Sequence, residues 1–89
     1  MDKRTTVLIA DNSEEFCASL SSALQQGDGF QVVATVSDGE QAVRQVLERK
    51  PQVLVLDLML AKKDGLGVLK ALSGMEHRPI TLATSGFVS

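Results

Sequence analysis

Two short apolar runs in the chain each end in residues with oxygen-bearing side chains. Asp57 follows residues 53–56 (Val-Leu-Val-Leu), and Asp11 and Asn12 follow residues 7–10 (Val-Leu-Ile-Ala). Such runs predict strands that are buried on both faces, and open α/β sheets bind ligands outside the carboxyl ends of their strands. If the two strands are neighbours, these three side chains form a cluster of oxygen atoms suited to a hard cation such as Mg²⁺.

Asp57 also has a plainer interpretation. A carboxylate at the end of a buried strand costs free energy unless it is paired, hydrogen-bonded or bound to a metal. An aspartate in that place can, however, simply begin a turn. Asp57 taken alone leaves both interpretations open, and the acid at the end of the other apolar run favours a chemical role.

Length and composition limit what the chain can be. Its 89 residues suffice for one small domain, and a content of 44% hydrophobic and 22% charged residues is typical of a folded globular chain. The net charge of -2 gives no attraction for nucleic acid or for an acidic membrane surface. The single cysteine, Cys17, cannot form an internal disulfide, and neither a signal peptide nor a membrane-spanning run is visible. We therefore expect a cytoplasmic protein, with no membrane and no nucleic-acid contact from this chain.

Strand-like and helix-like patterns alternate along the chain. Predicted strands cover residues 6–10, 30–36, a segment that begins at residue 53, and residues 80–84. Stretches with apolar residues at helical spacing separate these strands. The alternation predicts βαβ units and therefore a parallel sheet with helices on both faces.

Each predicted helix has a start signal and an apolar face. Asn12 or Ser13 caps the first helix, a capping box from Ser37 to Glu40 begins the second, and Asp64 caps the third. The side chains expected to face the core lie at helical spacing: Phe16, Leu20, Ala23 and Leu24, then Ala42, Val43, Val46 and Leu47, then Leu66, Val68, Leu69 and Leu72. Cys17 is interpreted as a small buried apolar residue rather than a nucleophile.

In this order and spacing, the motifs resemble the receiver domain of bacterial two-component response regulators. The matching features are the acidic end of the first strand, Asp57 at the end of the third, the pair Asp64-Gly65 that follows it, and Thr84, which ends the fourth strand with a hydroxyl group. The Ser-Asp-Gly-Glu segment at residues 37–40 also matches the family. The VLIADN and VLVLDL runs are most similar to the branch of the sporulation regulator, stage zero sporulation protein A.

The resemblance spans residues 1–89 and implies a CheY-like (flavodoxin-like) α/β fold. That fold is a doubly wound parallel sheet, incomplete here, with about four strands and three helices. We expect the chain to be the N-terminal part of a receiver, truncated before the fifth strand and the last helices. The family's lysine on that fifth strand would then be missing.

The resemblance also implies that the domain is a phosphoacceptor in a two-component or phosphorelay pathway and is not itself an enzyme. Asp57 would attack the phosphoryl group of a phosphohistidine on a sensor histidine kinase or a histidine phosphotransferase. Mg²⁺ would be held by Asp11, Asn12, Asp57 and the backbone carbonyl of Met59. Thr84 would donate its hydroxyl to the phosphoryl group and move inward. The phosphorylated domain would control an output domain, which we expect to be transcriptional.

Two further departures from the family pattern, besides the missing lysine, weaken this interpretation. Asn12 stands where the family usually has a second acid, so Mg²⁺ should bind more weakly. Leu60-Ala61 stands where the family commonly has Met-Pro, which leaves the loop after Asp57 without a fixed φ angle.

Truncation would leave the fourth strand as a sheet edge and open an apolar patch near the first and third strands. We expect such a fragment to form a homodimer or a domain-swapped assembly there.

Three other functions compete with that of a receiver. A pseudo-receiver, which acts as a protein-interaction module without taking a phosphate, is favoured by Asn12 and by the missing lysine. An aspartyl-phosphate hydrolase would need a second acid two residues after its nucleophile, where this chain has Met59. A dinucleotide-binding domain is excluded because no G-x-G-x-x-G motif follows the first strand.

Overall fold

The computed structural model describes residues 3–60 and 65–84 of the chain. Its strands are β1 (Thr5–Ala10), β2 (Phe30–Val36), β3 (Val53–Asp57) and β4 (Ile80–Thr84). Its helices are α1 (Glu14–Leu24), α2 (Gly39–Arg49) and α3 (Gly65–Leu72). Strands and helices alternate as predicted. Among these described segments, no helix is both long and apolar enough to cross a membrane.

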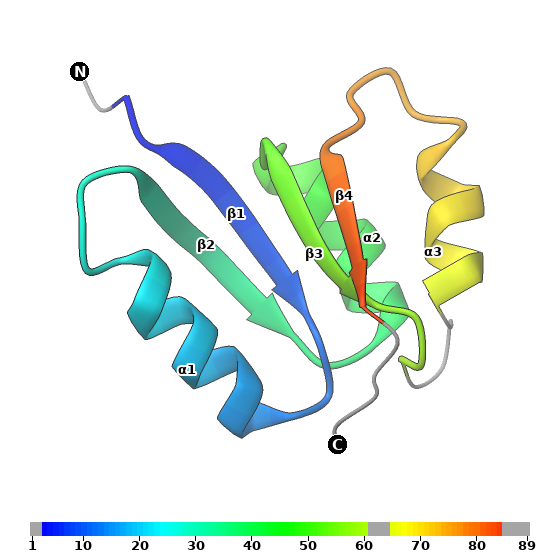
Figure 1. The fold of residues 1–89 in the computed structure, drawn as a ribbon. Coiled ribbons are helices and arrows are strands. Elements are labelled where there is room, and N and C mark those ends of the chain that lie inside the picture. Colours follow the sequence, from blue (N-terminus) through cyan, green and yellow to red (C-terminus); the bar gives the residue numbers. More distant parts are fainter. Residues whose placement is uncertain (1–2, 61–64, 85–89) are drawn as a thin grey trace.

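The strands form one parallel, four-stranded sheet in the order β2-β1-β3-β4 (Figure 1). α1 packs on one face of the sheet, and α2 and α3 pack on the other. β2 is added on one side of β1, whereas β3 and β4 follow on the other side. This is the doubly wound arrangement expected from the sequence. Its switch point lies between the carboxyl ends of β1 and β3, where such sheets form their ligand crevice.

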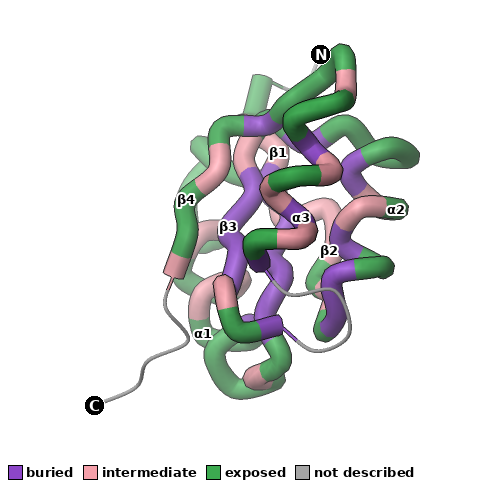
Figure 2. Tube along the Cα trace, turned by 90° about the vertical axis from the view of Figure 1, so that its right-hand side faces the viewer, coloured by how far each residue is buried: buried purple, intermediate pink, exposed green. Residues whose placement is uncertain are grey.

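Alternate residues of β1 and β3 build a separate apolar cluster on each face of the sheet. The cluster under α2 and α3 consists of Leu8, Ala10, Ala42, Val46, Leu54, Leu56, Leu60, Val68 and Leu72. The cluster under α1 is smaller and consists of Val7, Ile9, Cys17 and Val55. Figure 2 shows how the buried residues concentrate in these two strands. Because both strands are covered on both faces, their sequences read as unbroken apolar runs.

The observed helix starts differ in part from the predicted ones. Ser13 caps α1, where its hydroxyl accepts a hydrogen bond from the amide of Phe16 at 3.1 Å. The cap of α2 is Asp38, whose Oδ1 accepts from the amide of Gln41 at 2.8 Å. The predicted capping box that begins at Ser37 is therefore wrong by one residue, because a carboxylate in the next position makes the same bond. The predicted cap of α3, Asp64, lies outside the described residues.

Several side chains that helical spacing assigned to the core are exposed instead. Leu47 on α2 and Leu66 on α3 belong to this group, as do Phe16 and Ala23 on α1. Spacing identifies the apolar face of a helix but not how much of that face the neighbouring elements cover. The short helices here touch the sheet along a narrower stripe than their apolar residues occupy.

On the α1 face, β4 presents exposed apolar side chains. Ile80 and Leu82 are 69% and 56% exposed and pair in register with Val53 and Val55. Val55 is buried, as are residues 7–10 of β1, so the open patch expected near β1 and β3 lies one strand further along. Figure 2 shows the contrast between exposed β4 and buried β3. Association of copies of the chain through this surface stays a prediction.

Candidate functional site

Asp57 is the last residue of β3 and is only 3% exposed. Its Oδ1 atom accepts a hydrogen bond from the backbone amide of Met59 at 2.8 Å, which closes a short turn over the end of the strand. The carboxylate therefore does begin a turn, as the plainer interpretation had it. A carboxylate has two oxygens that can each accept more than one bond, so the turn leaves capacity for a ligand.

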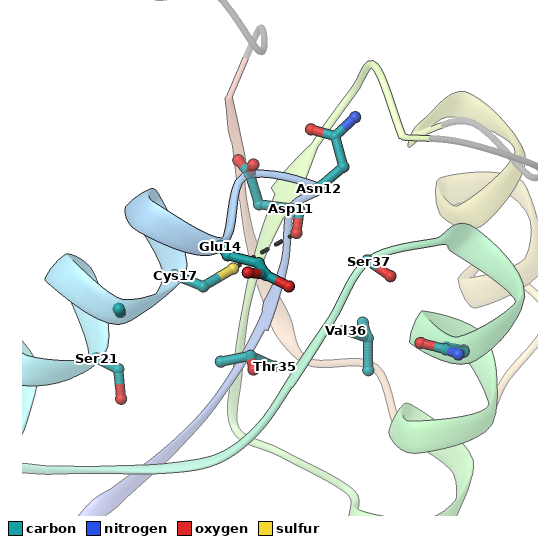
Figure 3. A pocket seen from close by; sticks show the side chains of 10 residues that line it. Asp11, Asn12, Glu14, Cys17, Ser21, Thr35, Val36 and Ser37 are labelled. Carbon is teal, nitrogen blue, oxygen red and sulfur yellow. Dashed lines mark hydrogen bonds between the residues drawn. The ribbon is translucent and has the colours of Figure 1, made fainter.

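Asp11 occupies the equivalent place after β1 and is 9% exposed. Its Oδ1 accepts from the backbone amide of Ser13 at 2.8 Å, and its own amide donates to the carbonyl of Val36 at 3.0 Å. The thiol of Cys17 donates to its backbone carbonyl at 3.4 Å. Asn12, the next residue, is exposed (Figure 3). Side chain and main chain of Asp11 are thus both fixed at this corner of the sheet.

The sheet brings the two acids to neighbouring positions. Ala10 of β1 pairs with Leu56 of β3. Asp11 directly follows the first of these residues, and Asp57 directly follows the second. Adjacent strands lie about 4.8 Å apart. The two carboxylates therefore leave the sheet at the same edge and at the switch point of the fold.

Thr84 is the third residue at this edge. It ends β4, pairs in register with Asp57, and accepts a hydrogen bond from the amide of Leu58 through its carbonyl at 2.9 Å. Its hydroxyl donates to the carbonyl of Leu56 at 3.5 Å. A hydrogen bond of that length is weak, so the hydroxyl can exchange it for a better acceptor near Asp57.

The turn after Asp57 exposes the side chain of Met59. Its amide is engaged with Asp57, so the group that Met59 can offer to a cation is its carbonyl oxygen. The lysines at positions 62 and 63, which follow this turn, and Ser85, which follows Thr84, lie outside the described residues. So does Asp64 of the motif Asp64-Gly65.

The chemistry of these donors fits Mg²⁺. This edge of the sheet supplies the carboxylates of Asp11 and Asp57, the amide oxygen of Asn12 and the carbonyl of Met59, all of them hard oxygen ligands. In residues 3–60 and 65–84, no group of three or more His, Cys, Asp or Glu side chains is placed to hold a metal ion. Mg²⁺ commonly binds to one or two carboxylates and completes its shell with water and substrate phosphate. These ligands therefore suit a cation that is shared with a phosphoryl group, rather than one enclosed by the protein alone.

The hydrogen bond from the thiol of Cys17 to the Asp11 carbonyl was not predicted from the sequence. Cys17 was expected to be buried and is buried, but its sulfur also holds the backbone of Asp11. Burial raises the pKa of this thiol, and the negative charges of Asp11 and Glu14 raise it further. Helical spacing carries no signal for such a bond, because it joins α1 to the preceding loop rather than to the sheet.

A cavity of about 460 Å³ adjoins the corner between α1 and the connection from β2 to α2 (Figure 3). It is lined by Asp11, Asn12, Glu14, Cys17, Ala18, Ser21, Thr35, Val36, Ser37 and Gln41. Most of these side chains are polar, and the cavity therefore extends the polar surface around Asp11 and Asn12.

Comparison with known proteins gives a family match over most of the chain. Residues 7–87 match the family model described as the response regulator receiver domain. A protein-glutamate methylesterase/protein-glutamine glutaminase of Myxococcus xanthus is 38% identical over 79 residues, which cover 89% of this chain and 23% of that protein. The chain thus spans about a quarter of the length of the curated relatives it matches.

Solved structures agree with the fold. The response regulator domain of Thermotoga maritima CheB superimposes with a TM-score of 0.82 at 24% identity, covering 91% of this chain and 61% of that one. CheY of Borrelia burgdorferi, solved as a CheX-CheY-BeF3-Mg²⁺ complex, gives a TM-score of 0.79 at 25% identity, covering 88% of this chain and 59% of that one.

Proposed function

The chain belongs to the response regulator receiver family, and from that premise we propose that Asp57 accepts a phosphoryl group from a phosphohistidine of a partner protein. The observation that carries the proposal is the shared edge of the sheet. There, a carboxylate almost closed to solvent lies beside the strand end that bears Asp11 and in register with Thr84. Phosphoryl transfer depends mainly on positioning and on charge stabilisation, and this corner offers both.

In the proposed reaction, an oxygen of Asp57 attacks the phosphorus atom. The phosphorus–nitrogen bond to the partner's imidazole breaks, its electron pair returns to the imidazole nitrogen, and Asp57 becomes an acyl phosphate. The bond from the Met59 amide fixes the carboxylate before the attack. The hydroxyl of Thr84 exchanges its 3.5 Å bond to Leu56 for the phosphoryl oxygen.

The proposed ligands of Mg²⁺ are Asp11, Asn12, Asp57 and the carbonyl of Met59. When bound, the cation neutralises negative charge on the phosphoryl oxygens. The bonds that fix the Asp11 main chain and carboxylate hold these ligands in place. In this role the domain is the substrate and the switch of a signalling reaction, and we propose no independent enzymatic activity for it.

The test is intact mass after incubation with acetyl phosphate and Mg²⁺. We expect the wild type to gain the mass of one phosphoryl group and Asp57→Asn to gain none. Asparagine keeps the oxygen that accepts from Met59, so this variant should fold. The matched control is Asp28→Asn, which removes an exposed acid in the connection between α1 and β2 and should be modified like the wild type. Equal modification of Asp57→Asn and the wild type would reject Asp57 as the acceptor.

A second candidate is a pseudo-receiver that binds a partner protein without taking a phosphate. It is favoured by the exposed Asn12, which stands where the family usually has an acid. An unmodified wild type in the mass experiment, with partner binding that Asp57→Asn does not alter, would favour this function.

For the partner, we propose a histidine kinase or a histidine phosphotransferase, since these proteins carry the phosphohistidine. For the output, we propose control of a further domain of a longer protein. Curated relatives of this chain include methylesterases, which supports a catalytic output and lends no support to the transcriptional output or to the sporulation branch suggested by the sequence. We keep the cytoplasm as the proposed location, where phosphorylated kinases would be accessible.

A further inference from the structure

The residue that follows Asp57 is held through both of its main-chain groups. The amide of Leu58 donates to the carbonyl of Thr84 at 2.9 Å, and the carbonyl of Leu58 accepts from the amide of Gly65 at 3.1 Å. The bond between Asp57 and Met59 spans the same residue. The turn of residues 57–59 is therefore tied to β4 on one side and to the first residue of α3 on the other.

Gly65 approaches Leu58 more closely than any other residue type could. A Cβ atom at position 65 would overlap the Cα of Leu58 and would lie 2.7 Å from its Cδ2 and 3.0 Å from its carbonyl carbon. Gly65 does not have the positive φ angle that favours glycine. The need for glycine therefore comes from the space beside Leu58 and not from the backbone conformation.

We propose that Gly65 is a positioning residue for the phosphoryl acceptor, a role that rests on the function proposed above. Its lack of a side chain lets α3 begin against the main chain of Leu58, and this contact sets the place of the Asp57 carboxylate and of the Met59 carbonyl. A Cβ at position 65 must displace Leu58. Because Leu58 is also bound to Thr84, the displacement passes into the turn and stretches the bond between Met59 and Asp57.

The experiment compares Gly65→Ala with Gly74→Ala by amide NMR of the folded chain during a Mg²⁺ titration. Gly74 follows the other end of α3, and a Cβ there would have its nearest contact at an ordinary 3.8 Å. We expect Gly65→Ala to weaken Mg²⁺ binding and to slow modification by acetyl phosphate, each roughly 10- to 100-fold, as misplacement by about 1 Å does in other sites. Gly74→Ala should match the wild type. Equal affinities and rates for all three proteins would overturn the proposal.

A double variant separates this role from ordinary side-chain crowding. Leu58→Ala removes Cδ2 but leaves the Cα that lies nearest to the added Cβ. We expect Leu58→Ala alone to keep Mg²⁺ affinity within about threefold of the wild type, since the main-chain bonds of Leu58 remain. We expect Leu58→Ala not to restore affinity to Gly65→Ala. Full recovery in the double variant would show that the side chain of Leu58, and not its main chain, sets the turn, and would overturn the proposal.

If Gly65→Ala fails to fold, amide hydrogen exchange of the wild type tests the proposal instead. The amides of Met59 and Gly65 should then exchange at least tenfold more slowly than in an unstructured peptide. Exchange of both amides at the unstructured rate would overturn the proposal. The hydrogen-exchange rates and the Mg²⁺ titration can both be measured without phosphorylation of the chain. A wild type that takes no phosphoryl group but shows the expected response to Gly65→Ala would reject the proposed function and retain the positioning of the turn.

Discussion

The two acidic corners of the site use the same turn but are supported differently. In each, an aspartate at the end of a strand accepts a 2.8 Å bond from the amide two residues later. The corner at Asp11 is held in part by side chains, since Ser13 caps α1 and the thiol of Cys17 reaches the Asp11 carbonyl. The corner at Asp57 is held by the main chain of Leu58, between Thr84 and Gly65.

The two kinds of support differ in how much change they tolerate. Side-chain support can be removed one atom group at a time, and each loss has a limited cost in free energy. Main-chain support that depends on a missing Cβ has no such gradation, because the smallest possible addition already overlaps the backbone of Leu58. We therefore expect the Asp11 corner to vary with modest effects and the Asp57 corner to be fixed.

The largest effect should come from breaking the Asp57 corner. Gly65→Ala should lower the free energy of unfolding by about 3 kcal/mol, because overpacking against backbone atoms forces a shift of both segments. Urea denaturation followed by circular dichroism measures this change. Gly74→Ala is the control and should stay within about 0.5 kcal/mol of the wild type. Equal losses in the two variants would remove the distinction between the corners.

A second prediction sharpens the comparison from the side of Asp11. Asn12→Asp should raise Mg²⁺ affinity about tenfold, because an added exposed charge near a divalent cation contributes between 1 and 2 kcal/mol at about 4 Å in water. Asn12 is exposed, so stability should hardly change. Calorimetric titration of both proteins with Mg²⁺ gives the ratio. Unchanged affinity would mean that residue 12 does not approach the cation.

A third prediction tests the side-chain support directly. Ser13→Ala removes the hydroxyl that accepts from Phe16 and should cost about 1 kcal/mol of stability, the usual value of a helix cap. The amide that donates to Asp11 is retained, so the turn at Asp11 should persist. Chemical denaturation gives the stability, and the chemical shift of the Ser13/Ala13 amide reports the turn. If the turn at Asp11 is lost together with the cap, the two interactions depend on each other, and the prediction that they are independent is wrong.

The smallest effect should be the dependence of stability on alkaline pH through Cys17. The folded state raises the pKa of this thiol, first by burial and then by the charges of Asp11 and Glu14. The unfolded chain therefore loses the thiol proton more readily, so this contribution is complete below the unfolded pKa and is lost as pH rises from there through the raised, folded pKa. Denaturation of the wild type and of Cys17→Ala at pH 8 and pH 10 isolates it. The wild type should lose more stability than the variant between these two values, and parallel losses would contradict the prediction.

Much of the fold could be predicted from the sequence. The bounds of β2 and β4 and the start of β3 agree with the predicted ranges, because strands buried on both faces produce unbroken apolar runs. The same property leaves the assignment to the sporulation branch of the family without support. The runs VLIADN and VLVLDL are largely what any central parallel strand requires, and the curated relative described above is a methylesterase.

The features that the sequence left open depend on contacts between elements. Leu47 and Leu66 have the spacing of core residues, but no described element covers them. Asp38 caps α2, instead of the predicted Ser37, because the Asp38 carboxylate accepts a hydrogen bond from the amide of Gln41. The order of the strands and their polar ends predicted that Asp11, Asp57 and Thr84 lie at one edge of the sheet. The thiol bond of Cys17 and the close approach of Gly65 to Leu58 appear only in three dimensions.

The register of the sheet has a consequence for how the site comes into existence. Asp11, Asp57 and Thr84 are far apart along the chain and meet only through the pairing of β1 with β3 and of β3 with β4. Contacts of such long sequence separation form late, after the entropy of closing the intervening loops has been overcome. A nascent or partly unfolded chain then has its aspartates but not the proposed acceptor site, so under the proposed function the ability to take a phosphoryl group is acquired together with cooperative folding.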